Sequence, residues 1–182
     1  METAELRNHV RRAARGDEEA AGLLFDHYYP RVFRYARGKL GRDADAEDVA
    51  AETFARVLRG LDRFKWKGAG FEAWLFRIAS NLVVDAHRRS SRETVEAAPA
   101  EQAVPPGELP ETLVMRAQSL SVLTSMLDRL PADQREVILL RFGADLDTNE
   151  VGRVMGRNAN AVRQLQFRAL QSLRTLTQET RA

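Results

Sequence analysis

Apolar residues recur at intervals of three and four along most of this chain, which is the spacing of one face of an α-helix. The pattern is plainest over 71–89, where the apolar side consists of Phe71, Trp74, Leu75, Ile78, Leu82 and Ala86. Similar stripes predict helices over 3–16, 17–40, 43–61, 113–130, 133–143, 148–155 and 158–176. We find no stretch with the alternating pattern of a strand, so the sequence predicts an all-α protein.

Small polar residues, glycines and prolines predict where the helices begin and end. Asp17 is suited to cap the second helix and Gly41 to end it, with Pro30 expected to bend or restart the helix between them. Asp43 or Asp45 is expected to cap the third helix.

The stretch from 93 to 112 has four of the chain's six prolines, no basic residue and no apolar periodicity. This composition predicts an extended, solvated linker. It divides the chain into a domain over 1–92, a flexible acidic linker over 93–112 and a second small helical domain over 113–182.

Charge follows the same division. Residues 1–92 hold 18 basic and 14 acidic side chains (net +4), residues 93–112 hold 0 and 5 (net −5), and residues 113–182 hold 10 and 7 (net +3). Two basic blocks joined by an acidic connector suggest two contacts with a polyanion. The absence of cysteine excludes disulfides and thiolate chemistry. The sequence shows no signal peptide and no apolar run long enough to span a membrane, so we expect a cytoplasmic protein without membrane insertion.

The pattern over 151–174 predicts a short helix, a turn at Gly156 and a longer helix capped by Asn158. One side of the long helix carries an apolar stripe, and no acidic residue occurs between Glu150 and Glu179. Cationic and polar residues occupy the other side, namely Arg163, Gln164, Phe167, Arg168, Gln171 and Arg174. A helix of this kind, entered through a glycine turn, is typical of a DNA-reading helix-turn-helix.

Two segments of the first domain also carry candidate chemistry. The helix from residue 43 begins with a run of carboxylates, in which Asp48 and Glu52 share one face. They could compensate the helix dipole, dock a basic partner or, least favoured, bind a divalent metal. The loop over 62–70 interleaves basic and aromatic residues, a composition that suits single-stranded nucleic acid, although its rings could instead pack in the core.

The segments 44–57, 64–89 and 130–174, in this order around an acidic linker, resemble bacterial RNA polymerase sigma factors of the extracytoplasmic-function (ECF) class, in the sigma-70 family. The resemblance implies a protein that is not an enzyme and needs no cofactor or metal. Such a factor binds core RNA polymerase through the β′ clamp helices and the β flap. It directs promoter-specific initiation by recognising the −10 and −35 elements and opening the DNA. Family members are often held inactive by an anti-sigma factor, which is a further candidate partner.

The resemblance also assigns residues. For polymerase binding it implies Asp45, Asp48 and Glu52. For recognition and melting of the −10 element it implies Lys65, Trp66, Lys67, Asn81, Asp85 and Arg88. For the −35 element it implies Arg163, Gln164, Phe167 and Arg168, where arginine suits guanine and an aromatic ring suits the thymine methyl group.

This chain departs from the family pattern on the reading helix. The family often has a basic residue at the position of Leu165 and a leucine at that of Gln166, so the rotation of the helix in the groove stays open. Residues 1–15 receive no role, and we expect no added regulatory domain after Arg174.

Two other functions remain as alternatives. One is a regulator that uses only the helix-turn-helix, with the first domain as a sensor, and would tolerate Trp66→Ala. The other is a metal-dependent hydrolase centred on Asp45, Asp48 and Glu52, which lacks support from the three histidines of the chain, His9, His27 and His87.

Overall fold

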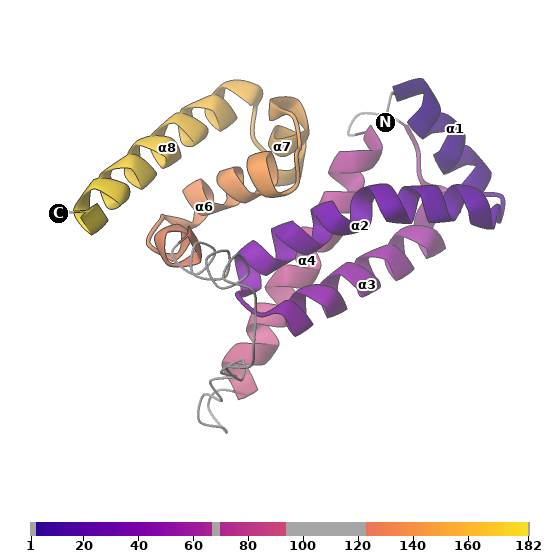
Figure 1. Cartoon of the computed structure of the whole chain (residues 1–182). Coiled ribbons are helices and arrows are strands. Elements are labelled where there is room, and N and C mark those ends of the chain that lie inside the picture. Colours follow the sequence, from indigo (N-terminus) through magenta and orange to yellow (C-terminus); the bar gives the residue numbers. More distant parts are fainter. Residues whose placement is uncertain (1–2, 67–69, 94–122, 182) are drawn as a thin grey trace, which may run out of the picture.

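The computed structural model describes residues 3–66, 70–93 and 123–181, and every regular element in these ranges is helical, as the sequence predicts (Figure 1). The N-terminal domain consists of α1 (Thr3–Ala13), α2 (Glu18–Leu40), α3 (Asp43–Gly60), the 3₁₀ turn η1 (Leu61–Arg63) and α4 (Gly70–Glu93). Helix α2 packs along α1, α3 and α4. The predicted linker over 93–112 lies, apart from Glu93, outside the described residues.

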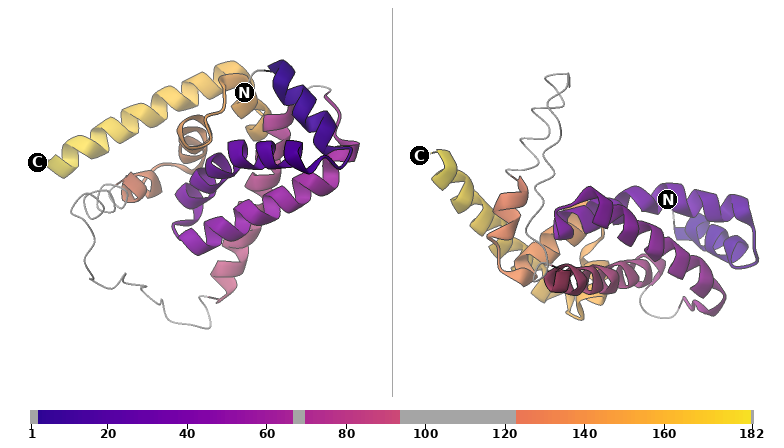
Figure 2. Two further views of the ribbon diagram at one scale, coloured as in Figure 1. Left: turned by 45° about the vertical axis from the view of Figure 1, so that its right-hand side comes forward. Right: turned by 90° about the horizontal axis from the view of Figure 1, so that it is seen from below.

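The C-terminal domain begins, among the described residues, with helical residues 123–128. It continues with α6 (Ala132–Ile138), the wider π-helical turn η2 (Leu139–Gly143), α7 (Thr148–Met155) and α8 (Ala159–Arg181). Helices α6 and α7 both pack on α8, which forms one edge of the molecule (Figure 2). No helix in the described ranges is both long enough and apolar enough to cross a membrane.

The ends of α2 follow the sequence prediction. The Asp17 side chain accepts a hydrogen bond from Ala20 N (3.1 Å), and Gly41 ends the helix with a left-handed φ of 80°. Pro30 does not restart the helix, since α2 is continuous from Glu18 to Leu40.

The predicted cap of α3 was wrong. Arg42 occupies the cap position without a side-chain cap hydrogen bond. The carboxylates expected to cap are engaged elsewhere: Asp43 pairs with Arg37, and Asp45 lies 3.6 Å from Arg42 Nε. An ion pair to an arginine has therefore taken the place of the side-chain cap.

The helix-turn-helix is bounded by local hydrogen bonds, and the sequence predicted those at Gly156 and Asn158. Asp147 caps α7 by accepting from Asn149 N and Glu150 N, while Glu150 accepts in return from Asp147 N. Gly156 ends α7 at a φ of 66°, and Asn158 accepts from Ala161 N (2.8 Å) at the start of α8. The turn between the two helices is thus bounded by local caps at Gly156 and Asn158.

Gly156→Ala is expected to destabilise the protein by about 1–2 kcal/mol, because a Cβ in the left-handed region clashes with its own backbone. Gly22→Ala, in the regular helix α2, is expected to stabilise it by about 0.5–1 kcal/mol. A Cβ at either position meets none of the described atoms within 4 Å, so the two changes differ only in backbone conformation. Urea unfolding of both variants measures the difference, and a change of the same sign at both glycines contradicts the prediction.

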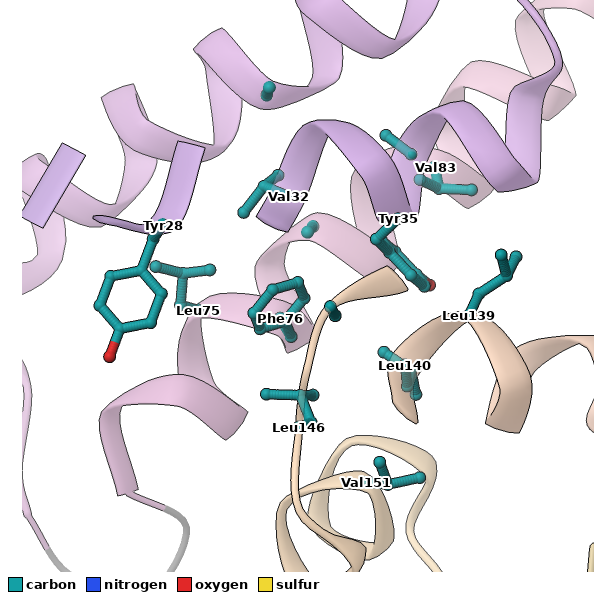
Figure 3. Packing of buried hydrophobic residues seen from close by; sticks show 14 of the residues in the cluster. Tyr28, Val32, Tyr35, Leu75, Phe76, Val83, Leu139, Leu140, Leu146 and Val151 are labelled. Carbon is teal, nitrogen blue, oxygen red and sulfur yellow. The ribbon is translucent and has the colours of Figure 1, made fainter. Parts of the chain in front are cut away.

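The two domains share one continuous hydrophobic core (Figure 3). Leu139, Leu140 and Leu146 of the C-terminal domain pack against Tyr35 and Phe76 of the N-terminal domain. A methyl group at Gly38 of α2 would clash with the Leu139 side chain, so the close approach here requires a residue without a side chain. The two domains are therefore joined by buried apolar side chains from both sides.

Candidate nucleic-acid and polymerase interfaces

Helix α8 presents the predicted −35 residues to solvent on one face. Arg163, Gln164 and Arg168 are exposed, and Phe167 is 63% exposed although it is aromatic. On the opposite side, Val162, Ala169 and Leu176 are buried, as the apolar stripe predicts. This face can therefore enter a groove of DNA without unfolding any of the domain.

The structure also shows which way the side chains of Leu165 and Gln166 point. Leu165 is half-buried and packs against the core, so it belongs to the apolar stripe. The Gln166 side chain accepts a hydrogen bond from Arg141 Nε of η2 (3.3 Å). Both residues therefore face the domain's own interior, and their departure from the family pattern does not alter the outward face of α8.

The loop before α4 carries aromatic residues that form a connected cluster. The Phe64 ring lies 5.2 Å from the Trp66 ring, 5.7 Å from that of Phe71 and 4.9 Å from that of Trp74. Trp66 is half-buried and Lys65 is exposed, while Lys67 lies outside the described residues. The cluster holds Trp66 at the surface with part of its ring accessible.

Helix α1, to which the sequence assigned no role, reaches this loop. The Arg7 guanidinium lies 5.0 Å from the centroid of the Trp66 ring, a cation–π contact. Leu6 and Val10 are buried against the rest of the domain. Their spacing of four residues was the available signal that α1 packs on the domain through one face.

Helices α3 and α4 enclose a groove of about 850 Å³. The predicted polymerase contacts Asp48 and Glu52 lie on its α3 side, and the predicted −10 contacts Asp85 and Arg88 lie on its α4 side. Asn81 is exposed on the same helix, one turn before Asp85. Asp45 lines a smaller groove next to it, again with Asp48. The structure thus brings two predicted contact sets, about 40 residues apart in sequence, onto adjoining surfaces.

Glu52 is held as a carboxylate by basic neighbours on its own helix. Arg56 Nε donates to Glu52 Oε1 (2.8 Å), and this hydrogen bond, with a further contribution from Arg59, lowers the pKa of Glu52. Across 3–66, 70–93 and 123–181 there is no group of three His, Asp or Glu side chains placed to hold a metal ion. The hydrolase alternative therefore finds no support in the arrangement of Asp45, Asp48 and Glu52.

The sequence did not predict a polar cluster that lies between the domains and includes Glu72 of α4. The side chain of Glu72 is only 24% exposed and accepts hydrogen bonds from Tyr28 Oη and Arg31 Nη1, both at 3.1 Å. Arg31 itself is 8% exposed and donates to backbone oxygens of the other domain, Ala144 O (2.7 Å) and Asp145 O (2.9 Å). The partners in this cluster are about 40 and 110 positions apart in the sequence, so only the folded structure brings them to light.

Comparison with known proteins shows the family to which both helical domains belong. Residues 24–93 match the family Sigma-70 region 2, and residues 126–175 match Sigma-70, region 4. The ECF RNA polymerase sigma factor BldN of Streptomyces coelicolor is 39% identical over 177 residues, which cover 96% of this chain and 67% of BldN. This chain is an ECF sigma factor of the sigma-70 family.

Other relatives extend over almost all of this sigma factor. The ECF sigma factor ShbA of Streptomyces griseus is 36% identical over 192 residues and covers 98% of each chain. Among solved structures, CnrH in complex with the cytosolic domain of CnrY has a TM-score of 0.75 and 26% identity, with 96% of this chain and 98% of CnrH covered. The sigma factor directs promoter-specific transcription initiation and is not an enzyme.

Proposed function

We propose that the two domains divide promoter recognition between them, the first over 1–92 and the second over 113–182. The second domain reads the −35 element through Arg163, Gln164, Phe167 and Arg168. The first recognises and opens the −10 element through Lys65, Trp66, Lys67, Asn81, Asp85 and Arg88. The observation that carries the proposal is the outward face of α8, cationic and with a solvent-exposed Phe167 at its centre.

We also propose that Asp45, Asp48 and Glu52 dock on the β′ clamp helices of core polymerase, while the C-terminal domain contacts the β flap. Asp48 is exposed and Glu52 is ionised beside Arg56, so both can meet a basic surface. This face remains open when the domains are packed together. Polymerase can therefore engage α3 first, before the two domains separate.

A protein that holds the factor inactive is a further proposed partner. Its support is that CnrH, similar to this chain over nearly all its length, was solved in complex with the cytosolic domain of another protein, CnrY. We also propose that this chain acts in the cytoplasm. An anti-sigma factor would bind it there.

Run-off transcription with core polymerase tests the proposed roles. The wild-type factor should give initiation from a defined set of promoters, and Trp66→Ala should retain polymerase binding but lose promoter opening. Single-base stacking on aromatic rings is worth about 1–3 kcal/mol, so opening should fall about 5- to 150-fold. Full promoter activity of Trp66→Ala, or duplex binding that needs no polymerase, would favour the regulator that uses only its helix-turn-helix.

Arg168→Ala is expected to weaken binding to a matched −35 site by about 1–3 kcal/mol if the guanidinium reads a base, with a smaller loss on scrambled DNA. Arg174→Ala is the matched control, because it removes the same charge from the same exposed helix six residues further on. The first turns of a reading helix contact the bases, so Arg174 should affect both DNAs alike. Equal losses on both DNAs for Arg168→Ala would make it a phosphate contact.

A further inference from the structure

The contact between the two domains combines apolar packing with buried hydrogen bonds. Besides the bonds from Arg31, Tyr35 Oη donates to Glu136 Oε1 (2.6 Å), and Lys39 Nζ lies 2.7 Å from Glu136 Oε2. Arg135 Nη2 donates back across the interface to Gly38 O (2.6 Å). These partners come from α2 on one side and α6 on the other, so the closed form is a specific arrangement.

Two carboxyl groups meet within this interface. Glu72 of α4 and Glu150 of α7 face each other where the two helices pack, close enough for their side chains to share a hydrogen bond. A hydrogen bond between two carboxyl groups requires a proton on one of them, because carboxylates have only acceptors. Glu72 already accepts from Tyr28 and Arg31, which favours its ionised form. The proton therefore resides on Glu150, which donates to Glu72.

We propose that this shared proton between Glu72 and Glu150 holds the two DNA-binding domains closed on each other, and that its loss favours the open form. When the domains separate, Glu150 returns to the exposed first turn of α7, where an ordinary carboxyl group is ionised at neutral pH. Closing then takes up one proton, and opening releases it. If both groups were ionised in the closed form, two negative charges would lie side by side next to the positive charge of Arg31.

The electrostatics of the pair agree with this assignment. Burial, followed by the hydrogen bond to Glu72, raises the pKa of Glu150 to about 8. Burial also acts to raise the pKa of Glu72, but the hydrogen bonds from Glu150, Arg31 and Tyr28 outweigh it, and the pKa of Glu72 is lowered. The two pKa values move apart, as expected for two acids that share one proton.

Other charged groups around the pair come from each neighbouring element. Helix α2 contributes His27, whose Nε2 lies 3.4 Å from Arg31 Nη1, and burial lowers the pKa of His27. The chain leading into α7 contributes Asp147, which donates its backbone N–H to Glu150 Oε2 (2.7 Å). Arg153 of α7 lies near the start of α4, where a Cβ on Gly70 would be 3.7 Å from its Nη1. Arg141 of η2 turns instead toward Gln166 and Leu146 O.

The closed form cannot reach both promoter elements, a consequence that rests on the proposed function. Elements centred at −35 and −10 are about 25 base pairs apart, or ~85 Å along B-form DNA. A compact chain of this length is only about 40 Å across, from the usual scaling of radius of gyration with length. The 20 residues of the predicted linker over 93–112 have a fully extended length of about 70 Å, enough to let the domains part.

The sign of the pH effect follows from the raised pKa of Glu150. The stabilisation of the closed form is complete below the ordinary carboxyl pKa of about 4.5 and decreases as pH rises toward the closed-form value of about 8. One proton changes the ratio of closed to open molecules by at most about tenfold per pH unit in this window. Higher pH therefore releases the domains, and lower pH keeps them together.

Energy transfer between two dyes on the full chain measures this ratio without polymerase or DNA. The chain has no cysteine, so Glu47→Cys on α3 and Gln178→Cys on α8, both at exposed positions, give two labelling sites. Between pH 5.5 and 8.5 we expect the ratio of closed to open molecules to fall at least about tenfold. In the same labelled background, Glu150→Gln keeps a donor toward Glu72 and an acceptor for Asp147 N, so it should stay closed with no pH dependence.

Two controls separate the carboxyl pair from its neighbours. His27→Gln should keep the wild-type pH dependence, whereas Glu136→Gln should lower the closed fraction without changing its pH dependence. If Glu150→Gln fails to fold by circular dichroism, Glu72→Gln provides the same test from the other side. A wild-type ratio that does not change with pH, or an unaltered pH dependence in the folded glutamine variant, overturns the proposal.

A transcription assay then tests the consequence for function. At pH 8, Glu150→Gln should require more factor than the wild type for half-maximal run-off transcription, because more of it is closed. If a variant shown to be closed needs no more factor than the wild type for half-maximal transcription, closure is not inhibitory. If the wild-type factor shows no promoter specificity, the proposed function fails. The proposal for the carboxyl pair is unaffected by that result, because the dye measurement does not depend on promoter recognition.

Discussion

Arg31→Ala is expected to separate the two domains, with a cost to the closed form of about 3–5 kcal/mol, the range for breaking a buried ion pair from one side. The change leaves Glu72 without its cation and removes the donors to Ala144 O and Asp145 O. It also removes the guanidinium from above the Tyr28 ring, 4.9 Å from its centroid. Energy transfer between the labelled domains should fall to the open-state value at pH 7.

Arg34→Ala is the matched control for this prediction. Arg34 lies one turn further along α2 and also reaches the C-terminal domain, by a hydrogen bond from its Nε to Gly143 O (3.0 Å), but it is exposed. Exposed hydrogen bonds compete with water, so the cost should be about 1 kcal/mol or less. Similar separation of the domains in the two variants would show that the buried charge of Arg31 is not what joins the domains.

Phe71→Ala is expected to lower the free energy of unfolding by about 3–5 kcal/mol and to abolish promoter opening in the molecules that remain folded. Phe71 is 1% exposed, and its ring lies 5.5 Å from that of Tyr28 and 5.9 Å from that of Trp74. Without it, Phe64 loses one of the rings that hold the loop over 64–66 in place. Urea unfolding gives the stability, and permanganate reactivity of −10 thymines gives the opening.

Phe142→Ala is the control for Phe71→Ala, because it removes the same ring from a position that is 58% exposed. Surface substitutions usually change stability by less than about 0.5 kcal/mol, so this variant should unfold like the wild type. Phe71→Leu, which keeps most of the buried volume, should fold stably and still open promoters poorly. Normal opening by a folded Phe71→Leu protein would separate the aromatic cluster from DNA melting.

The sequence was sufficient where structure depends on neighbours along the chain. The helix-turn-helix is an example, since Gly156 and Asn158 act through their own backbone and the next three residues. The exposed face of α8 was predicted for the same reason, because a helix fixes the relative direction of side chains three and four residues apart. The cap of α3 failed because Arg37, six residues away on another helix, binds Asp43.

The packing of the domains was decided only by tertiary structure. The periodicity of α4 predicted one apolar side, yet Ala73, Phe76, Ala79 and Val83 are also buried. A second buried side arises where the C-terminal domain lies against α4, and nothing in the local pattern states which helix will cover it. For the same reason nothing in the local sequence indicated that Glu72 lies between Arg31 and Glu150.

What the sequence determined by itself is therefore the helical character of the described segments, the ends of α2 and α7, and the outward face of α8. These properties follow from backbone geometry and from side chains within about one turn of each other. The contact of Arg7 with Trp66 and the pairing of Glu72 with Glu150 required the folded molecule. Both join residues that are about 60 to 80 positions apart, and the distance between such residues is fixed by packing of the whole chain rather than by any local preference.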